Sequence, residues 1–204
     1  MKGTIVIKAE AIAQAKNAYR IEKECIEEML DYFDEASFSA ACDLILQANR
    51  IGTSGCGHSG ILCQHFSHLL CCIELSAKFI SPAEAVHGGM GFLQKDDVIF
   101  LVSRGGKTSE LLPIAQICKK KGIKIISITE NTESELASVS NVVLKQHVNR
   151  ETDKYNSQGT TSSTALCTIF HAIVTALIEE IDYKNETFAV IHPGGAVGER
   201  LNNL

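Results

Sequence analysis

The sequence predicts an α/β protein, a three-layer αβα sandwich built around a five-stranded parallel sheet. Short apolar runs, typical of buried strands, alternate along the chain with longer segments of helical periodicity. Such alternation is typical of a parallel sheet that helices cover on both faces. Apolar residues make up 45% of the 204 residues, which is enough for a sizeable core and suits one domain over 1–204.

The elements are expected in a regular order. The first helix, over 9–32, is predicted because Ile12, Ala15 and Tyr19 begin a series of apolar residues at steps of three and four. Segments of similar periodicity predict further helices over 38–48, 61–72, 109–121, 134–139 and 161–181. Short apolar runs predict strands over 49–53, 74–80, 98–102, 123–128 and 141–144, with a turn or short helix at 82–85.

Composition and charge narrow the class of protein. The net charge is −5 and no basic stripe is present, so nucleic acid is not expected as a partner. No apolar run approaches the roughly 20 residues of a membrane span, and the first residues lack the apolar segment of a signal peptide. We therefore expect a cytoplasmic protein without a membrane partner. The eight cysteines form no ladder of CxxC pairs and are expected to be small buried hydrophobes in a reducing compartment.

Two of the expected strands end in loops rich in glycine and hydroxyl groups. They read Ser-Gly-Cys-Gly-His-Ser-Gly at 54–60 and Ser-Arg-Gly-Gly-Lys-Thr-Ser at 103–109, and a third patch of five hydroxyls at 160–164 begins the long helix. Ligands of open α/β sheets bind beyond the carboxyl ends of strands. Glycine admits a ligand close to backbone N–H groups, and helix N-termini attract anions. We expect a phosphate cradle, although glycine and serine are also ordinary turn and cap residues.

The loops and histidines do not indicate a nucleotide, a cofactor or a metal. Neither loop has the GxxxxGK[ST] pattern, and neither reads GxGxxG with an acidic residue about 20 positions later. His65 and His68 share a helical face without a carboxylate at ligand spacing, so a metal site there is not expected. His58, His87 and His192 could hold zinc if they gathered around one pocket. Our prediction is nevertheless a protein with neither metal nor cofactor.

Five motifs resemble those of the sugar isomerase (SIS) domain, and within it the arabinose 5-phosphate isomerase branch. They are GCGHSG at 55–60, PAEAVHGGMG at 82–91, SRGGKTSEL at 103–111, TSST at 161–164 and HPGGAVGERL at 192–201. The resemblance covers residues 22–201. It implies a flavodoxin-like fold, phosphosugar binding and a homo-oligomer with sites near subunit contacts. Members of that branch interconvert ribulose 5-phosphate and arabinose 5-phosphate without a redox cofactor. The chain ends at Leu204, where many members continue into CBS modules, so none is expected.

The resemblance also implies roles for individual residues. The substrate-binding and phosphate-cradling positions of the family correspond to Gly57, Ser59, Ser103, Gly106, Thr108, Thr161, Ser162 and Ser163. Its two acids correspond to Glu110 and, in the polar loop at 149–159, to Glu151. Its two histidines correspond to His87 and His192.

The chain departs from the usual pattern of the branch at several positions. His58 replaces the lysine of the first loop, Ile61 replaces a histidine, and Gly89 replaces an aspartate. The serine loop, usually SNSGE, contains Arg104 and Lys107 instead. These two cations could place positive charge near an anionic ligand.

The expected chemistry is aldose–ketose isomerisation through an enediol. A base removes the proton beside the carbonyl group while an acid protonates the carbonyl oxygen. The candidates are Glu110 and Glu151 as carboxylates and His192, His87 and His58 as imidazoles. Two alternatives stay open, namely a phosphosugar-binding module without catalysis and a phosphosugar lyase or deaminase. Two acids favour an enzyme over a pure binder, because carboxylates repel phosphate.

We also expect a homodimer or homotetramer. The amphipathic first helix and the detached HPGG tail both indicate surfaces that need a partner subunit. His192 is expected to lie close to the site of a neighbouring chain.

Overall fold

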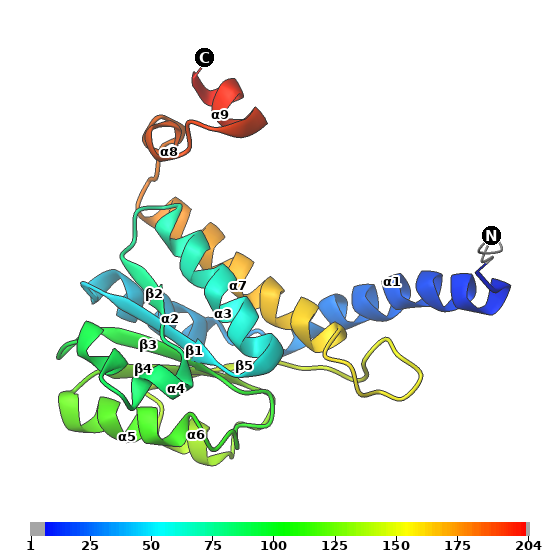
Figure 1. Ribbon diagram of the computed structural model, residues 1–204, viewed down its shortest axis with the longest axis horizontal. Coiled ribbons are helices and arrows are strands. Elements are labelled where there is room, and N and C mark those ends of the chain that lie inside the picture. The colour runs from blue at the N-terminus through cyan, green and yellow to red at the C-terminus, as the bar shows by residue number, and fades with distance from the viewer. Residues whose placement is uncertain (1–6, 203–204) are drawn as a thin grey trace, which may run out of the picture.

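Five parallel strands form the centre of the computed structural model, which describes residues 7–202 (Figure 1). The strands are β1 (Ile51–Gly55), β2 (Ala77–Phe79), β3 (Val98–Val102), β4 (Lys124–Thr129) and β5 (Val142–Lys145). Their order across the sheet is β2-β1-β3-β4-β5. The chain therefore leaves β1 toward one edge and returns to the other side of it at β3. The loops after β1 and β3 flank this switch point, where α/β proteins bind their ligands.

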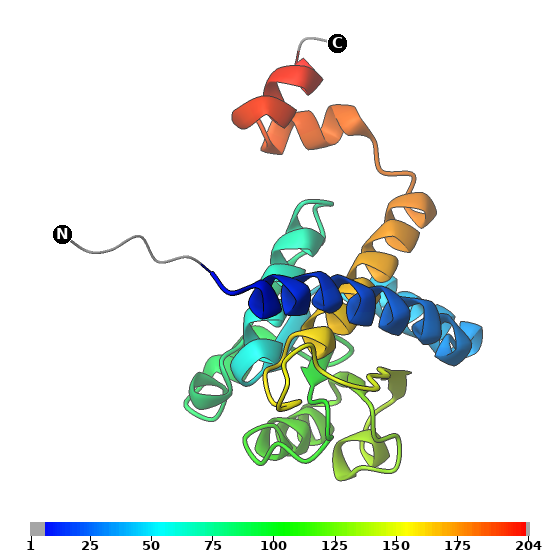
Figure 2. The same ribbon diagram turned by 90° about the vertical axis from the view of Figure 1, so that its right-hand side faces the viewer.

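Helices cover both faces of the sheet, which confirms the predicted three-layer architecture (Figures 1 and 2). The helices before β3 are α1 (Ala9–Met29), η1 (Leu30–Tyr32), α2 (Glu35–Gln47), α3 (Gly57–Cys71), α4 (Pro82–Ala85) and η2 (Gly89–Phe92). Those after it are α5 (Leu112–Lys121), α6 (Glu135–Ser138), α7 (Thr161–Glu180), α8 (Asn185–Ile191) and α9 (Gly195–Asn202). One layer contains α2, α3 and α7, and the opposite layer contains α5 and α6 (Figure 1). Helix α1 crosses over α7 (Figure 2) and projects beyond the sheet (Figure 1).

The core has two parts because side chains alternate between the two faces of each strand. Phe100 of β3 points into the layer of α3 and α7, where Phe66 and Phe170 stack with ring centroids 4.1 Å apart and planes 6° apart. Ile99 and Leu101, its neighbours in sequence, pack against the α5 layer. Helix α7 is long and apolar enough by composition to cross a membrane. Its apolar face instead packs on the sheet, so α7 is a core helix.

Several boundaries differ from the sequence-based expectation. Helix α3 begins at Gly57 rather than at residue 61, so His58 and Ser59 belong to its first turn. Helix α5 begins at Leu112 rather than at residue 109, with a proline in its first turn, the position that proline favours. Strand β2 covers only three of the residues expected for 74–80, because Glu74 at φ +58° still belongs to the turn after α3.

The expectation that the cysteines are buried is confirmed for only three of the eight. All eight thiols are free, and three of them, Cys25, Cys63 and Cys118, are buried. Cys71 is exposed, and the remaining four are half-buried.

The tail forms two short helices, α8 and α9, where the sequence predicted only a turn. His192, Pro193 and Gly194 separate them, and Gly195, the first residue of α9, has φ +71°. Gly198 fits against the preceding turn, since a Cβ there would lie 2.5 Å from the carbonyl oxygen of His192. The pair lies beyond the end of α7 and away from the sheet (Figure 1).

Candidate phosphosugar site

The loop after β3 forms a pair of hydroxyl groups at the carboxyl end of the sheet. Ser103 is buried, and its Oγ lies 2.7 Å from Thr108 Oγ1. One hydroxyl donates to the other, which leaves a single hydroxyl hydrogen free to reach a ligand oxygen. Gly106 turns the loop at φ +65°, and a Cβ there would overlap the side chain of Ser134. Only glycine fits this turn, because it alone combines the left-handed backbone with no side chain.

The start of α3 offers a second set of donors. The first hydrogen bond of this helix joins Gly60 N–H to the Cys56 carbonyl oxygen at 3.3 Å. The N–H groups of Gly57, His58 and Ser59 precede it and have no carbonyl partner within the helix. Strand and helix approach very closely here, since a Cβ on Gly60 would lie 2.5 Å from the Gly55 carbonyl oxygen. The helix N-terminus is therefore held at the sheet edge, where it favours a negatively charged group.

Glu110 lines a cavity of about 350 Å³ beside this helix start. The walls come from the beginning of α3, the end of β2 and the beginning of α4, and they include Gly57, Gly60, Phe79, Ser81 and Pro82. The Ser109 hydroxyl donates to Glu110 Oε2 at 2.9 Å. Hydrogen bonds from its own backbone N–H and from Ser109 hold the pKa of Glu110 below its ordinary value. Glu110 is therefore ionised at neutral pH and can accept a proton.

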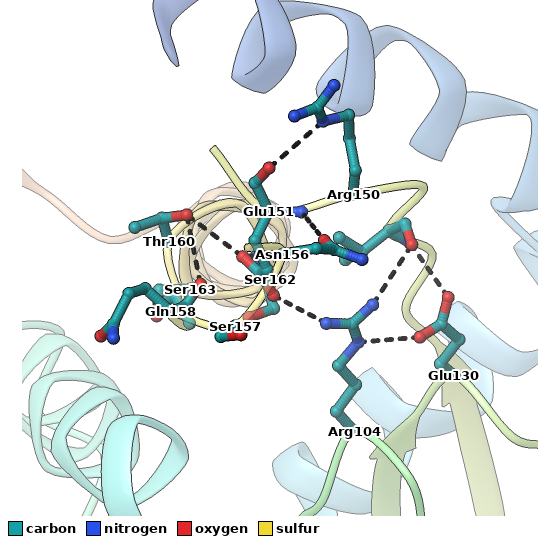
Figure 3. Close-up of polar contacts among 12 residues, drawn as sticks. Arg104, Glu130, Arg150, Glu151, Asn156, Ser157, Gln158, Thr160, Ser162 and Ser163 are labelled. Carbon is teal, nitrogen blue, oxygen red and sulfur yellow. Dashed lines mark hydrogen bonds and ion pairs between the residues drawn. The ribbon is translucent and has the colours of Figure 1, made fainter. Parts of the chain in front are cut away.

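Glu151, on the loop before α7, is buried and already accepts three hydrogen bonds (Figure 3). Arg104 Nη1 donates to its Oε1 at 2.7 Å. Its Oε2 accepts from Thr160 Oγ1 at 3.2 Å and from Ser162 N–H at 3.1 Å. Arg104 binds a second carboxylate through Nε, 2.8 Å from Glu130 Oε2. Glu151 therefore joins the serine loop to the N-terminus of α7, where a carboxylate is electrostatically favoured.

The first turn of α7 divides the predicted hydroxyl cluster between the surface and the interior. Ser162 and Ser163 are half-buried, and the Ser163 hydroxyl donates to the Gly159 carbonyl oxygen. Thr161 is fully buried, and its hydroxyl has no hydrogen-bond partner within residues 7–202. The surface hydroxyls are the ones that a ligand can reach from the sheet edge.

Contacts connect these segments into one region. The His58 ring lies against Gly159, where a Cβ would approach His58 Cδ2 to 3.0 Å. Gly159 leads into α7, the helix whose Ser162 N–H binds Glu151. Glu151 in turn binds Arg104, the neighbour of Ser103. The loop after β1, the serine loop and the start of α7 therefore meet at the carboxyl edge of the sheet, as their sequences predict.

The remaining two histidines lie outside this region. His87 is exposed and follows α4, whose first residues line the cavity with Glu110. His192 ends α8, beyond the end of α7, and its ring packs on Phe188 with centroids 5.0 Å apart. Its Nδ1 is buried without a hydrogen-bond partner in the described part of the chain. The α8–α9 pair lies beyond the far end of α7, away from the sheet (Figure 1), whereas His58 is in the first turn of α3, so a single chain does not bring His192 to His58.

The two cations of the serine loop have different surroundings. Arg104 is engaged by Glu130 and Glu151, so its charge is already balanced within the protein. Lys107 is exposed and forms no ion pair with any residue between 7 and 202. Lys107 is therefore the cation of this loop that remains available to an anionic ligand.

The family model of the SIS domain matches residues 44–176, from α2 to α7. The chain belongs to the SIS domain family. The matched segment includes every loop that meets at the carboxyl edge of the sheet, whereas α8 and α9 lie outside it. The recognition of this family from the sequence motifs is confirmed.

Proteins similar to this SIS chain include sugar-phosphate isomerases. It is 34% identical over 194 residues to an arabinose 5-phosphate isomerase, KdsD, of Francisella tularensis, covering 93% of the chain and 59% of that relative. The chain thus spans less than two thirds of the length of the curated relatives that it matches.

Solved structures agree with this fold. A putative sugar-phosphate isomerase of Listeria monocytogenes superposes with a TM-score of 0.88 at 34% identity, covering 93% of this chain and all of that one. An Escherichia coli CFT073 protein solved in complex with arabinose 5-phosphate gives a TM-score of 0.86 at 27% identity, covering 92% of this chain and all of that one. The predicted flavodoxin-like SIS fold is confirmed.

Proposed function

We propose that this chain is a phosphosugar aldose–ketose isomerase that interconverts arabinose 5-phosphate and ribulose 5-phosphate through an enediol. The observation that carries the proposal is the ionised, exposed carboxylate of Glu110 on a cavity whose other walls include the N-terminus of α3. The likeness to named arabinose 5-phosphate isomerases and to a protein solved with arabinose 5-phosphate supports this choice of substrate. We further propose that residues 1–204 act as one phosphosugar-binding domain in the cytoplasm.

The phosphate group is held by neutral donors and helix ends. Ser59, Ser103 and Thr108 supply hydroxyl groups, and Ser162 adds one from α7; Ser163 adds another when its hydroxyl turns away from the Gly159 carbonyl oxygen. The N-termini of α3 and α7 point at the same edge of the sheet, so their dipoles both favour the dianion. Lys107 adds the single unpaired cation of this loop within the described residues.

Glu110 acts as the base. With the phosphate anchored, the carboxylate takes the proton from C2 of the aldose while an acid protonates the O1 carbonyl oxygen, which gives the enediol. Return of the carbon-bound proton to C1 and loss of the O2 proton give the ketose. The proton count balances within the substrate and the two side chains, so no redox cofactor is required.

Glu151 and the histidines have different parts in this proposal. Because Glu151 already accepts three hydrogen bonds, it acts as a positioning residue that holds the serine loop and α7 together. His192 is the proposed acid, supplied by the α8–α9 tail of a neighbouring subunit. His58 lies at this edge of the sheet, and we propose that His87, which follows α4 beside the cavity, lies on the path by which the sugar enters.

A homodimer or homotetramer is therefore part of the proposal. An apolar groove of about 520 Å³ lies between α1, α2, β5 and α7, lined in part by Met29, Leu30, Phe33 and Phe38. Exposed apolar residues also occur on the tail, with Val190 77% and Ile191 44% exposed. Such surfaces are typical of subunit contacts. Light scattering should give a homo-oligomer, and a monomer at assay concentration would contradict this part.

The experiment that tests the function follows solvent deuterium into each sugar phosphate. Glu110→Gln should keep sugar-phosphate binding but slow turnover by about 10²–10⁴-fold, the usual contribution of a general base. Glu133→Gln, an exposed glutamate on another loop, is the matched control and should keep full turnover. Ser103→Ala should weaken binding by about 1–3 kcal/mol because a charged acceptor loses a donor.

Two results would overturn the proposal. Tight binding without any deuterium exchange in the wild type would identify a phosphosugar-binding module instead. Full turnover of Glu110→Gln would exclude this carboxylate as the base.

A further inference from the structure

Three metal-ligating side chains meet on the outer surface of the α3–α7 pair. His65 comes from α3, whereas Cys167 and His171 come from α7. Their ligand atoms all lie within 4.8 Å of one another. Cys167 Sγ lies 3.7 Å from His171 Nε2, and the two imidazole rings are 6.0 Å apart at 81°. The two helices run side by side in both views (Figures 1 and 2).

The fold fixes the backbones that carry these ligands. Cys167 and His171 are four residues apart, so they project from the same face of α7. His65 is adjacent in sequence to Phe66, which is fully buried and stacks on Phe170, the neighbour of His171. A core contact thus sets the spacing of the two helices directly beneath the cluster. Only the side chains have to adjust when a ligand binds.

The donor set selects the class of ion. Two imidazoles and one thiol, without a carboxylate, suit a borderline or soft transition metal rather than Mg²⁺ or Ca²⁺. In a tetrahedral zinc site with Zn–N and Zn–S bonds of about 2.0–2.3 Å, two ligand atoms lie about 3.4–3.8 Å apart. The Cys167–His171 pair already has this separation. His65 and His171 are exposed, so rotation of their imidazoles can close the remaining gap.

We propose that His65, Cys167 and His171 form a Zn²⁺ site that joins α3 to α7. Three protein ligands leave the fourth tetrahedral position to water on this solvent-facing surface. A cysteine thiol that binds no metal carries its proton at neutral pH. Zinc binding replaces that proton: the Sγ–H bond breaks, the Zn–S bond forms, and one proton enters the solvent. The ion then links the two helices whose first turns carry His58, Ser59 and Ser162.

The chain contains a built-in control for this proposal. His68 and Cys72 of the same helix α3 are also four residues apart, with Nε2 and Sγ separated by 3.6 Å. Within the described residues no third ligand lies close enough to complete a metal cluster there. A histidine–cysteine pair at helical spacing is therefore present at both places, but only one of them has the ligand from a second helix.

The first experiment measures zinc affinity by competition with a chromophoric chelator, using the metal-free protein of residues 1–204 under reducing conditions. The wild type should bind one Zn²⁺ per chain. His65→Gln, Cys167→Ser and His171→Gln should each weaken binding by about 100-fold or more, since even the loss of a supporting hydrogen bond costs 10–100-fold. The control variants His68→Gln and Cys72→Ser should bind like the wild type. Equal affinity of all variants, or loss of binding in the control pair, would overturn the site.

Two further readouts identify the ligands directly. Co²⁺ used in place of Zn²⁺ should give a thiolate-to-metal charge-transfer band that Cys167→Ser abolishes and Cys72→Ser retains. At about pH 8, where free imidazoles are neutral, the wild type should release one proton more per bound Zn²⁺ than Cys167→Ser; any proton lost by the zinc-bound water is common to both. Zinc should also raise the melting temperature of the wild type by several degrees and leave that of Cys167→Ser unchanged.

Another location for the ion would give a different pattern. If His87→Gln removed the tight zinc while His65→Gln kept it, the ion would belong to the candidate sugar site and this proposal would be wrong. As a folding control, the melting temperature of each variant is measured in the presence of a chelator. It should equal that of the metal-free wild type, which shows that the replacement itself leaves the fold intact.

Discussion

Replacement of Glu151 by glutamine separates a positioning role from a catalytic one. The carboxylate faces donors on both oxygens, with Arg104 Nη1 on Oε1 and Thr160 Oγ1 and Ser162 N–H on Oε2. A glutamine has only one acceptor oxygen. Its NH₂ group must therefore face either the guanidinium or the N-terminus of α7, and a buried donor loses its acceptor.

The magnitude follows from the burial of the two partners. An unpaired buried donor costs about 1–3 kcal/mol, and the loss of the charge weakens the hydrogen bond that remains. The side chain of Glu151 is 3% exposed, but that of Arg104 is 38% exposed, so solvent screens part of the effect. We expect the free energy of unfolding to fall by about 2–4 kcal/mol. For Glu130→Gln, at a carboxylate 32% exposed, we expect only about 0.5–1 kcal/mol.

The assay is urea unfolding of both variants at one protein concentration, because subunit association contributes to the apparent stability. Turnover is measured on the same samples below the transition. If Glu151→Gln were as stable as Glu130→Gln, within about 0.5 kcal/mol, the reasoning from the three donors would be refuted. Loss of turnover at full stability would instead identify Glu151 as a base.

Two other predictions concern the walls of the site. Gly106→Ala should lower the free energy of unfolding by about 2–4 kcal/mol, because a side chain at φ +65° is strained and overlaps Ser134. Gly105→Ala, with nothing within 4 Å of its Cβ, should change it by less than about 0.5 kcal/mol; equal effects in urea would contradict the steric argument. Burial and the charge of Glu110 raise the pKa of the Cys56 thiol. Glu110→Gln should therefore lower that pKa and speed alkylation of Cys56 roughly twofold at about pH 8, followed by peptide mass spectrometry; an unchanged rate would show that the two groups do not interact.

The sequence is sufficient to predict those parts of the fold that local patterns determine. The apolar run at 98–102 and the periodicity after residue 161 correspond to β3 and α7 at the predicted positions. Boundaries shift where backbone conformation decides, as at Gly57, which has φ +56° and starts α3 four residues before the predicted position. The two tail helices were missed, since α8 and α9 are short and pack mainly on each other.

In the candidate site, too, local sequence patterns predict the position of single residues but not the contacts between residues far apart in the sequence. Hydroxyl-rich strand ends predicted where Ser59 and Ser103 lie, because parallel strands place their carboxyl ends at one edge. The link from Arg104 to Glu130 and Glu151 joins residues 26 and 47 positions apart, and no local pattern reports such a pairing. The only available signal for Glu130 was a charged residue directly after the apolar run of β4. Likewise, the spacing of Cys167 and His171 is visible in the sequence, but the approach of His65 depends on helix packing.

The strand order also has a consequence for synthesis on the ribosome. Because β1 lies between β2 and β3, Ile51 cannot pair with its second neighbouring strand until Val98 of β3 has been synthesised. The N-terminus of α7, which completes the contacts of Glu151, is translated later still. Chains emerge from the ribosome residue by residue, N-terminal end first. A nascent chain that stops before residue 162 therefore contains all five strands but cannot form the contact between Glu151 and the start of α7 at the sheet edge. Affinity for a sugar phosphate would arise late and abruptly during translation, as a sign that the whole sheet and its last core helix are in place.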